Sequence, residues 1–315
     1  MRTARLGRSG PEISRLGIGG WQAGGPGPWG AGEPADDGDV VAAIRRAVEL
    51  GVNWVDTAAS YGLGHSEEVV ARALLPWRTG DEVLIFSKCG HPWDAPDRIR
   101  TDLRPASIRA ECEGTLRRLG VERIDLYQFH HADRAVAVEE SWEAMAGLVG
   151  EGKVRLAGVS NFGVDLLDRC EAIRHVDCVQ PEFNLLSCDA ADDVIPWCRA
   201  HGSGVIVYSP AASGLLARAR DLASLAAMTE QDRRLTSAEQ ILRLSRRLRA
   251  VAGRLGTSMS ALAIAWTLAT DGVAGAICGA RRPAHVDSWI EAGDLDLDPA
   301  SLAEIESIAG GAAGR

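Results

Sequence analysis

Four residues of this chain have the chemistry to deliver a proton to a carbonyl oxygen. Asp56, Lys88 and His130 each directly follow a short apolar run, and Tyr61 lies five residues after Asp56. A phenol can donate a proton, an ammonium can adjust the pKa of that phenol, and an imidazole can hydrogen-bond to the oxygen that receives the proton. The set therefore predicts general acid catalysis with Tyr61 as the donor.

Lys88 is one of only two lysines among the 34 basic residues of the chain. Arginine cannot act as a compact ammonium, so a lysine here indicates a need for a point charge. Asp56 is its expected counter-ion, because a buried ammonium without a partner is costly. Such an ammonium is expected to lower the pKa of Tyr61 from about 10. The alternative is an ordinary surface lysine at the end of a strand.

The elements that must bring these residues together alternate along the chain. Short apolar runs are each followed by a loop and a helical pattern, which is typical of a parallel sheet covered by helices. The predicted strands are 16–18, 52–55, 83–87, 124–129, 154–159, 176–179, 205–208 and 273–278. We expect one (β/α)₈ TIM barrel domain over 1–315, with an N-terminal β-hairpin, extra C-terminal helices and a disordered tail from about 310. A doubly wound sheet is the alternative, and it is weakened because no G-x-G-x-x-G opens a helix directly after a strand.

Polar residues follow seven of these runs at the same end. In chain order they are Asp56, Lys88, His130, Ser160-Asn161, Gln180, Tyr208-Ser209-Pro210 and Gly279-Ala280-Arg281-Arg282. A barrel places its chemistry at the carboxyl ends of its strands. The pattern predicts a single mouth lined for binding and catalysis.

Composition excludes several classes of protein. The 315 residues carry a formal charge of −9, which argues against nucleic acid or an anionic membrane as a partner. No apolar run approaches the roughly 18–20 residues that span a bilayer, and the N-terminus does not resemble a signal peptide, so we expect a cytoplasmic protein. The seven cysteines form no C-x-x-C pair and are expected in the core.

No metal site is predicted from the seven histidines. His130 and His131 are adjacent, so alternation along a strand is expected to point them to opposite faces. His131 is accordingly predicted to face the helices rather than the site.

The chain resembles the aldo-keto reductase superfamily over nearly its whole length, and most closely a bacterial branch that uses NADP. The segments that carry the resemblance are GVNWVDTA at 51–58 with Tyr61-Gly62 and HSEE at 65–68, IDLYQFH at 124–130, GKVR at 152–155, GVSNF at 158–162 and VYSP at 207–210. The resemblance implies NADP(H) as cofactor. It also implies Tyr61 as the general acid, supported by Lys88, Asp56 and His130.

The same resemblance assigns cofactor-binding roles to other mouth residues. Ser160, Asn161 and Gln180 would hold the nicotinamide carboxamide, and Tyr208 would stack on the ring. Ser209, Pro210, Gly214 and Leu215 would wrap the pyrophosphate, while Gly20 and Trp21 would touch the nicotinamide ribose. The segment after the last strand would contribute Gly279, Arg281, Arg282 and His285, with the two arginines as candidates for the 2′-phosphate of NADPH.

The last segment departs from the family pattern. Family members commonly have proline before the glycine after the eighth strand, and glutamate then asparagine further on, where this chain has Cys278, Ser288 and Trp289. Trp289 is expected either to stack on adenine or to pack on the barrel.

The loops expected at the mouth suggest where a substrate lies. Trp21, Trp29 and Trp93 are candidates for an aromatic wall around it, with rim packing as the alternative. The segment 217–240 is expected to be a lid over the cofactor or a variable loop.

Together these features predict an NADPH-dependent oxidoreductase that reduces an aldehyde or ketone to an alcohol. The alternatives are a sugar or polyol dehydrogenase, a reductase of a deoxysugar pathway, and a cofactor-binding regulatory subunit. The expected partner is a small-molecule carbonyl substrate, and a monomer is favoured.

Overall fold

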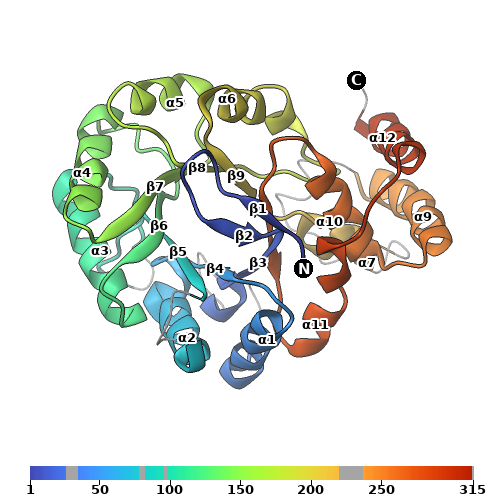
Figure 1. Cartoon of the computed structure of the whole chain (residues 1–315), viewed down its shortest axis with the longest axis horizontal. Coiled ribbons are helices and arrows are strands. Elements are labelled where there is room, and N and C mark those ends of the chain that lie inside the picture. Colours follow the sequence, from blue (N-terminus) through green and yellow to red (C-terminus); the bar gives the residue numbers. More distant parts are fainter. Residues whose placement is uncertain (26–34, 78–81, 96–97, 220–236, 314–315) are drawn as a thin grey trace.

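The computed structural model describes residues 1–25, 35–77, 82–95, 98–219 and 237–313. Its centre is a closed, parallel eight-stranded barrel, which confirms the predicted (β/α)₈ fold (Figure 1). In sequence order the strands neighbour one another around the ring, and β10 closes it against β3. The strands are β3 (Leu16–Gly19), β4 (Trp54–Asp56), β5 (Leu84–Cys89), β6 (Ile124–Phe129), β7 (Val154–Ser160), β8 (Cys178–Gln180), β9 (Gly204–Val207) and β10 (Gly275–Gly279).

Helices surround the barrel, and the two helices at 238–255 and 299–313 lie together at one side of it (Figure 1). The helices are α1 (Asp37–Glu49), α2 (His65–Ala73), α3 (Pro105–Leu119), α4 (Val138–Gly150), α5 (Val164–Glu171), α6 (Val194–His201), α7 (Leu215–Arg218), α9 (Ala238–Leu255), α10 (Met259–Ala269), α11 (Pro283–Asp287) and α12 (Pro299–Ala313). Local sequence sets several boundaries: Ser237 forms a capping box with Gln240 at the start of α9, and Gly256 ends that helix in a left-handed conformation. Helix α12 continues through Ala313, and residues 314–315 of the expected disordered tail lie outside the described residues.

The predicted hairpin closes the amino-terminal end of the barrel. β1 (Thr3–Arg5) pairs antiparallel with β2 (Glu12–Ser14), and the hairpin lies across the ring in Figure 1. Its turn fits closely: Gly7 has a φ of 65°, and a Cβ there would lie 2.7 Å from the backbone nitrogen of Gly204. Ser14 accepts a hydrogen bond from the Trp54 indole at 2.8 Å. Access to the barrel interior is therefore left to the carboxyl ends of the strands.

The barrel interior next to the hairpin is apolar. A buried cluster joins Leu6 and Ile13 of the hairpin to Trp54, Phe86 and Leu126 on the strands. Trp54 stacks on Phe86 with ring centroids 5.2 Å apart. This packed apolar layer separates the hairpin from the polar residues at the mouth.

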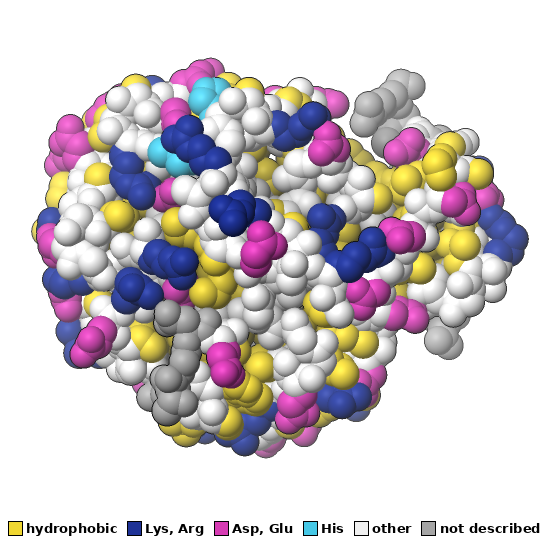
Figure 2. All heavy atoms as spheres, in the orientation of Figure 1, with side chains coloured by type: hydrophobic (Ala, Val, Ile, Leu, Met, Phe, Trp, Pro, Cys, Tyr) yellow, Lys and Arg dark blue, Asp and Glu magenta, His cyan; other side chains and the backbone are white. Residues whose placement is uncertain are grey.

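The charged surface and the buried cysteines match what the amino-acid composition predicts. Figure 2 shows acidic and basic side chains interspersed over the hairpin end of the molecule. None of the described helices is long and apolar enough to cross a membrane. The cysteines form no disulfide, and all are buried except the half-buried Cys188, as expected for core residues.

Candidate active site

The four candidate catalytic residues meet at the carboxyl end of the barrel. Asp56 ends β4, Lys88 is the penultimate residue of β5, and His130 directly follows β6, while Tyr61 begins the short helix η2 (Tyr61–Gly64) after β4. Because β4, β5 and β6 are parallel neighbours, their ends bring these side chains to one place.

Lys88 and Asp56 form a buried ion pair. The side chains are 1% and 4% exposed, and Lys88 Nζ donates to Asp56 Oδ1 and, at 3.0 Å, to the carbonyl oxygen of Thr57. The pairing expected from sequence is therefore present, and Lys88 is not a surface lysine. A buried pair of this kind needs its remaining hydrogen-bond capacity filled.

Two glutamines donate hydrogen bonds to the second carboxylate oxygen of Asp56. Gln180 Nε2 donates to Asp56 Oδ2 at 3.0 Å and Gln128 Nε2 donates at 3.3 Å, while Gln180 Nε2 also lies 3.1 Å from Gln128 Oε1. Sequence analysis did not single out Gln128. Its signal was an amide inside the apolar run 124–129.

Tyr61 lies beside this pair and against His130. Lys88 Nζ is 5.2 Å from the centroid of the Tyr61 ring, and the Tyr61 hydroxyl is 3.5 Å from His130 Nε2. On its other side, the His130 Nδ1 atom is 3.5 Å from Ser60 Oγ. The phenol of Tyr61 thus lies next to both the ammonium and the imidazole.

A close contact between two loops holds Tyr61 in place. Gly62 has a φ of 59°, and a Cβ there would lie 2.7 Å from the carbonyl oxygen of Gly24. Gly24 ends the short helix η1 (Trp21–Gly24), which packs on η2. Only glycine at position 62 combines this φ with this approach.

Electrostatics keep this site in one protonation state near neutral pH. Burial raises the pKa of Tyr61 above its ordinary value, and Lys88 offsets only part of that rise. The expected net lowering is therefore wrong, because desolvation of the phenolate outweighs the attraction of an ammonium already paired with Asp56. Although burial opposes its charge, Asp56 raises the pKa of Lys88. Burial, then Lys88, lowers the pKa of His130 well below its usual range, so this imidazole is neutral.

The residues predicted to hold a carboxamide and a nicotinamide ring line the mouth next to His130. Asn161 Nδ2 donates to the His130 carbonyl oxygen at 3.0 Å, and Tyr208 donates from its hydroxyl to Asn161 Oδ1 at 2.9 Å. Ser160 Oγ donates to the Gln180 carbonyl at 2.8 Å. The Gln180 amide nitrogen points inward to Asp56, so a carboxamide would have to meet its oxygen instead.

The loop after β9 has an unusual backbone. Ser209, Ala212 and Ser213 have φ values of 54°, 47° and 52°, and Gly214 follows at 74° before Leu215 begins α7. Left-handed conformations are unfavourable for residues with a Cβ, and they tend to occur where function requires them. Pro210 is buried within this loop, and a Cβ built on Gly214 would meet nothing within 4 Å. Successive backbone N–H groups in such a loop can cradle an anion.

The segment after β10 presents two arginines. Arg281 and Arg282 lie just past Gly279, before α11, and Arg282 Nε is 3.2 Å from His285 Nε2. Burial, followed by the two arginines, lowers the pKa of His285, so it is neutral and adds no charge. Trp289 is buried and donates to the Gly279 carbonyl at 3.3 Å, so it packs on the barrel, whereas Ser288 is exposed.

The aromatic candidates for a substrate wall lie in different settings. Trp21 is 40% exposed, next to the buried Gly20, whose position would place a Cβ 2.7 Å from Ser66 Oγ. Trp93 is half-buried, with the Arg118 guanidinium 5.6 Å from its ring centroid. Trp29 and most of the candidate lid, 220–236, lie outside the described residues.

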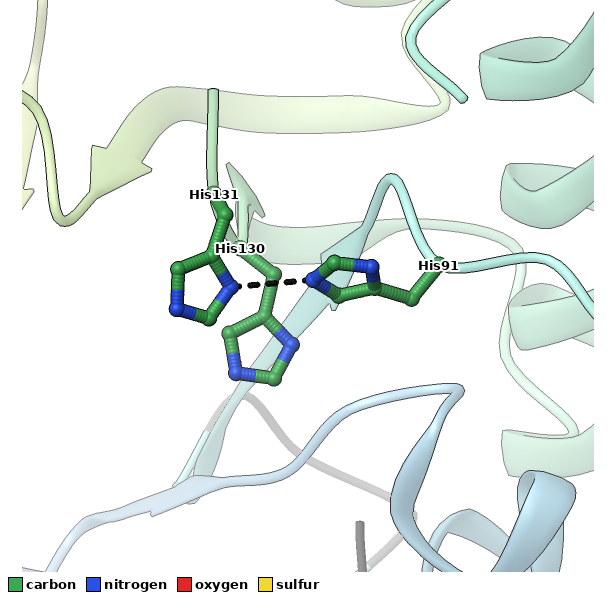
Figure 3. A group of neighbouring side chains, drawn as sticks. All are labelled: His91, His130 and His131. Carbon is green, nitrogen blue, oxygen red and sulfur yellow. Dashed lines mark hydrogen bonds between the residues drawn. The ribbon is translucent and has the colours of Figure 1, made fainter. Parts of the chain in front are cut away.

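His131 is not directed toward the helices as expected. Its ring stacks on that of His130 with centroids 5.0 Å apart and an interplanar angle of 23°. Both residues come after the last residue of β6, where strand alternation no longer applies. His91, two residues past β5, joins them (Figure 3).

The fold and this site define a (β/α)₈-barrel protein whose polar centre lies at the carboxyl ends of the strands. The model of the aldo/keto reductase family matches residues 15–309, so the chain belongs to that family and is an oxidoreductase. Aldo-keto reductase YhdN of Bacillus subtilis (strain 168) is 30% identical over 320 residues, which cover 98% of this chain and 93% of that protein.

Solved structures agree with this assignment. The glycerol dehydrogenase AKR11B4 from Gluconobacter oxydans superposes with a TM-score of 0.85 at 30% identity, covering 99% of this chain and 96% of the other. The aldo-keto reductase AKR11C1 from Bacillus halodurans, in its holo form, superposes with a TM-score of 0.83 at 24% identity, covering 98% and 96%. The second similarity supports the fold alone.

Proposed function

We propose that this protein reduces an aldehyde or ketone to the alcohol with NADPH, using Tyr61 as the general acid. The observation that carries the proposal is the position of the Tyr61 hydroxyl, beside a buried Lys88–Asp56 pair and 3.5 Å from a neutral His130. Enzymes of the aldo-keto reductase family generally use a nicotinamide cofactor. We propose three points beyond that family property: NADPH is the cofactor, a carbonyl compound is the substrate, and Tyr61 is the general acid.

The mouth residues suit a nicotinamide dinucleotide. Asn161, Ser160 and the Gln180 oxygen offer partners for a carboxamide, and Tyr208 offers a ring face next to them. The left-handed stretch from Ser209 to Gly214 offers backbone N–H groups and open space for a pyrophosphate, and Gly20 and Trp21 would contact the ribose. The donors are neutral or cationic, as a phosphate ligand requires.

Arg281 and Arg282 favour NADPH over NADH in this proposal. Two adjacent guanidinium groups present forks of N–H donors that match phosphate oxygens, whereas a ribose hydroxyl gives them little to bind. His285 is neutral and lies against Arg282, so it orients that side chain without competing for the anion.

When bound, a reduced nicotinamide supplies the hydride that reaches the carbonyl carbon. Tyr61 holds the carbonyl oxygen and gives it the proton, so that the C=O bond becomes CH–OH. His130, with its proton on Nε2, donates a second hydrogen bond to the oxygen as negative charge develops there. Lys88 then stabilises the phenolate that remains on Tyr61, and Asp56 keeps Lys88 in position.

A Tyr61→Phe variant tests the proposal. We expect turnover to fall by about 10²–10⁴-fold, the usual contribution of general acid catalysis, while NADPH binding measured by fluorescence quenching is unchanged. Tyr127→Phe is the matched control, because Tyr127 lies in β6 with its side chain in the core between barrel and helices. Turnover by Tyr61→Phe at the wild-type rate would refute the role of Tyr61.

A second candidate is oxidation of a polyol, the same reaction in reverse. It is favoured by the 30% identity to a protein named glycerol dehydrogenase. In that direction the Tyr61 phenolate, held by Lys88, would accept the proton. Initial rates on matched carbonyl and alcohol pairs, measured at one pH in both directions, distinguish the two candidates.

A further inference from the structure

Three histidines gather at one side of the mouth. His91 follows β5, and His130 and His131 follow β6, and Figure 3 shows the three rings in contact. His91 Nε2 and His131 Nδ1 are 2.9 Å apart and share a hydrogen bond. The His91 and His130 ring centroids are 5.2 Å apart. One nitrogen from each ring lies within 4.8 Å of the other two.

We propose that His91, His130 and His131 form a binding site for a divalent transition-metal ion such as Zn²⁺, and that the ion inhibits the enzyme. Three imidazoles without a carboxylate form a ligand set for Zn²⁺, Co²⁺ or Cu²⁺ rather than for Mg²⁺ or Ca²⁺. Tetrahedral metal–nitrogen bonds of about 2.0–2.1 Å place ligand nitrogens roughly 3.4 Å apart. The hydrogen-bonded nitrogens of His91 and His131, now 2.9 Å apart, must therefore separate slightly, and nitrogens as far as 4.8 Å apart must approach by rotation of the imidazole rings. The proton in the hydrogen bond between His91 Nε2 and His131 Nδ1 moves to the other nitrogen of the ring that carries it, so both lone pairs can bind the ion and both imidazoles stay neutral.

The surroundings allow the ion to bind. The nearest fixed cation, Lys88, is paired with Asp56, which reduces its repulsion of an incoming ion. The turn that carries His91 is held from below, because Glu111 accepts from the backbone N–H groups of Gly90 and His91 at 3.0 and 3.3 Å.

Inhibition follows because His130 is both a ligand of the ion and the residue that donates a hydrogen bond to the carbonyl oxygen. An ion bound to its ring removes the imidazole from the carbonyl oxygen and places a positive charge beside Tyr61, whose hydroxyl is 3.5 Å from His130 Nε2. This consequence rests on the proposed function, whereas metal binding itself does not.

Titration of the metal-free full-length protein with Co²⁺ tests the site without an activity assay. We expect one equivalent to produce the intense visible bands of tetrahedral Co²⁺, without the near-ultraviolet band of a thiolate ligand, and Zn²⁺ to displace it. His91→Gln and His131→Gln should each weaken binding on the order of 100-fold, since one of three protein ligands is lost. His201→Gln on α6, away from the cluster, is the control and should bind like the wild type.

The outcomes separate this inference from the proposed function. Inhibition of carbonyl reduction by Zn²⁺, reversed by a chelator and weakened in His131→Gln, supports both. A Co²⁺ spectrum in a protein that turns over no carbonyl supports the metal site and contradicts the function. Absence of the spectrum, a thiolate band, or equal binding by His131→Gln and wild type would overturn the metal site.

Discussion

At the scale of single residues, the site depends on a carboxylate whose hydrogen-bonding capacity is filled. Asp56 receives Lys88 on one oxygen and the amides of Gln180 and Gln128 on the other. A buried ion pair gains little from its charges alone, but removing one partner leaves the other uncompensated. Stability and chemistry can therefore be separated at this pair.

Lys88→Met should lose both stability and activity. The Asp56 carboxylate would be left buried without its cation, at a cost of about 3–5 kcal/mol in the free energy of unfolding, measured by denaturant titration. The double variant Asp56→Asn with Lys88→Met should recover most of that loss, because no buried charge remains. It should recover none of the activity, since nothing stabilises the Tyr61 phenolate. Activity returning with stability would contradict the proposed role of Lys88.

The pH dependence of reduction follows from the raised pKa of Tyr61. Its phenol must be protonated to act as an acid, and burial raises its pKa above the ordinary value of 10.0. The kcat/KM for carbonyl reduction should therefore be flat from neutral pH to about pH 10 and fall only above it. A fall with an apparent pKa well below 10 would mean that Lys88 dominates over burial.

At the scale of elements, two short loops position Tyr61, the proposed acid. Tyr61 lies in η2, and η2 fits against η1 only because Gly24 and Gly62 lack side chains at their contact. The loops thereby set the distance from the Tyr61 hydroxyl to His130, which stands on a different strand end.

Gly62→Ala should reduce turnover by about tenfold or more while the barrel remains folded. An added Cβ would lie 2.7 Å from the Gly24 carbonyl oxygen, so the loop and Tyr61 must shift, and displacements on the order of 1 Å have large effects on catalysis. Gly152→Ala is the matched control, because Gly152 also has a left-handed φ, 75°, but has no atom within 4 Å of a built Cβ. Steady-state kinetics and circular dichroism measure both effects, and equal losses of turnover would indicate backbone strain alone.

At the scale of the whole molecule, an acidic protein presents a basic pair beside its mouth. The chain carries a net charge of −9, yet Arg281 and Arg282 follow β10 with a neutral histidine next to them. Local charge rather than net charge thus decides which cofactor is attracted.

Replacing Arg281 and Arg282 with Ala should weaken NADPH far more than NADH. Hydrogen bonds to charged groups contribute about 1.5–3 kcal/mol each, so the dissociation constant of NADPH should rise by at least about tenfold. Arg199→Ala provides a control for loss of a surface charge, since Arg199 pairs with Asp271 elsewhere. Equal weakening of both cofactors would place the 2′-phosphate away from these arginines.

The amino-acid pattern by itself favoured a barrel over a doubly wound sheet and indicated the four candidate catalytic positions. Apolar runs with a polar residue at the same end of each are a local signal, and parallel closure turns that signal into one mouth. Asp56 and Lys88 could be paired from sequence because a buried ammonium without a counter-ion is costly. Gln128 could have been noticed as an amide inside an apolar strand.

Only the tertiary structure decided the features that depend on neighbours from distant segments. The direction of the Tyr61 pKa is a balance between burial and Lys88, and burial is a property of the packed loops rather than of the residues. The stacking of His131 on His130, and the contact of His91 with His131, depend on the paths of the two chain segments that leave β5 and β6. Periodicity ends with the strand, so no sequence pattern extends into these turns, and only packing places their side chains.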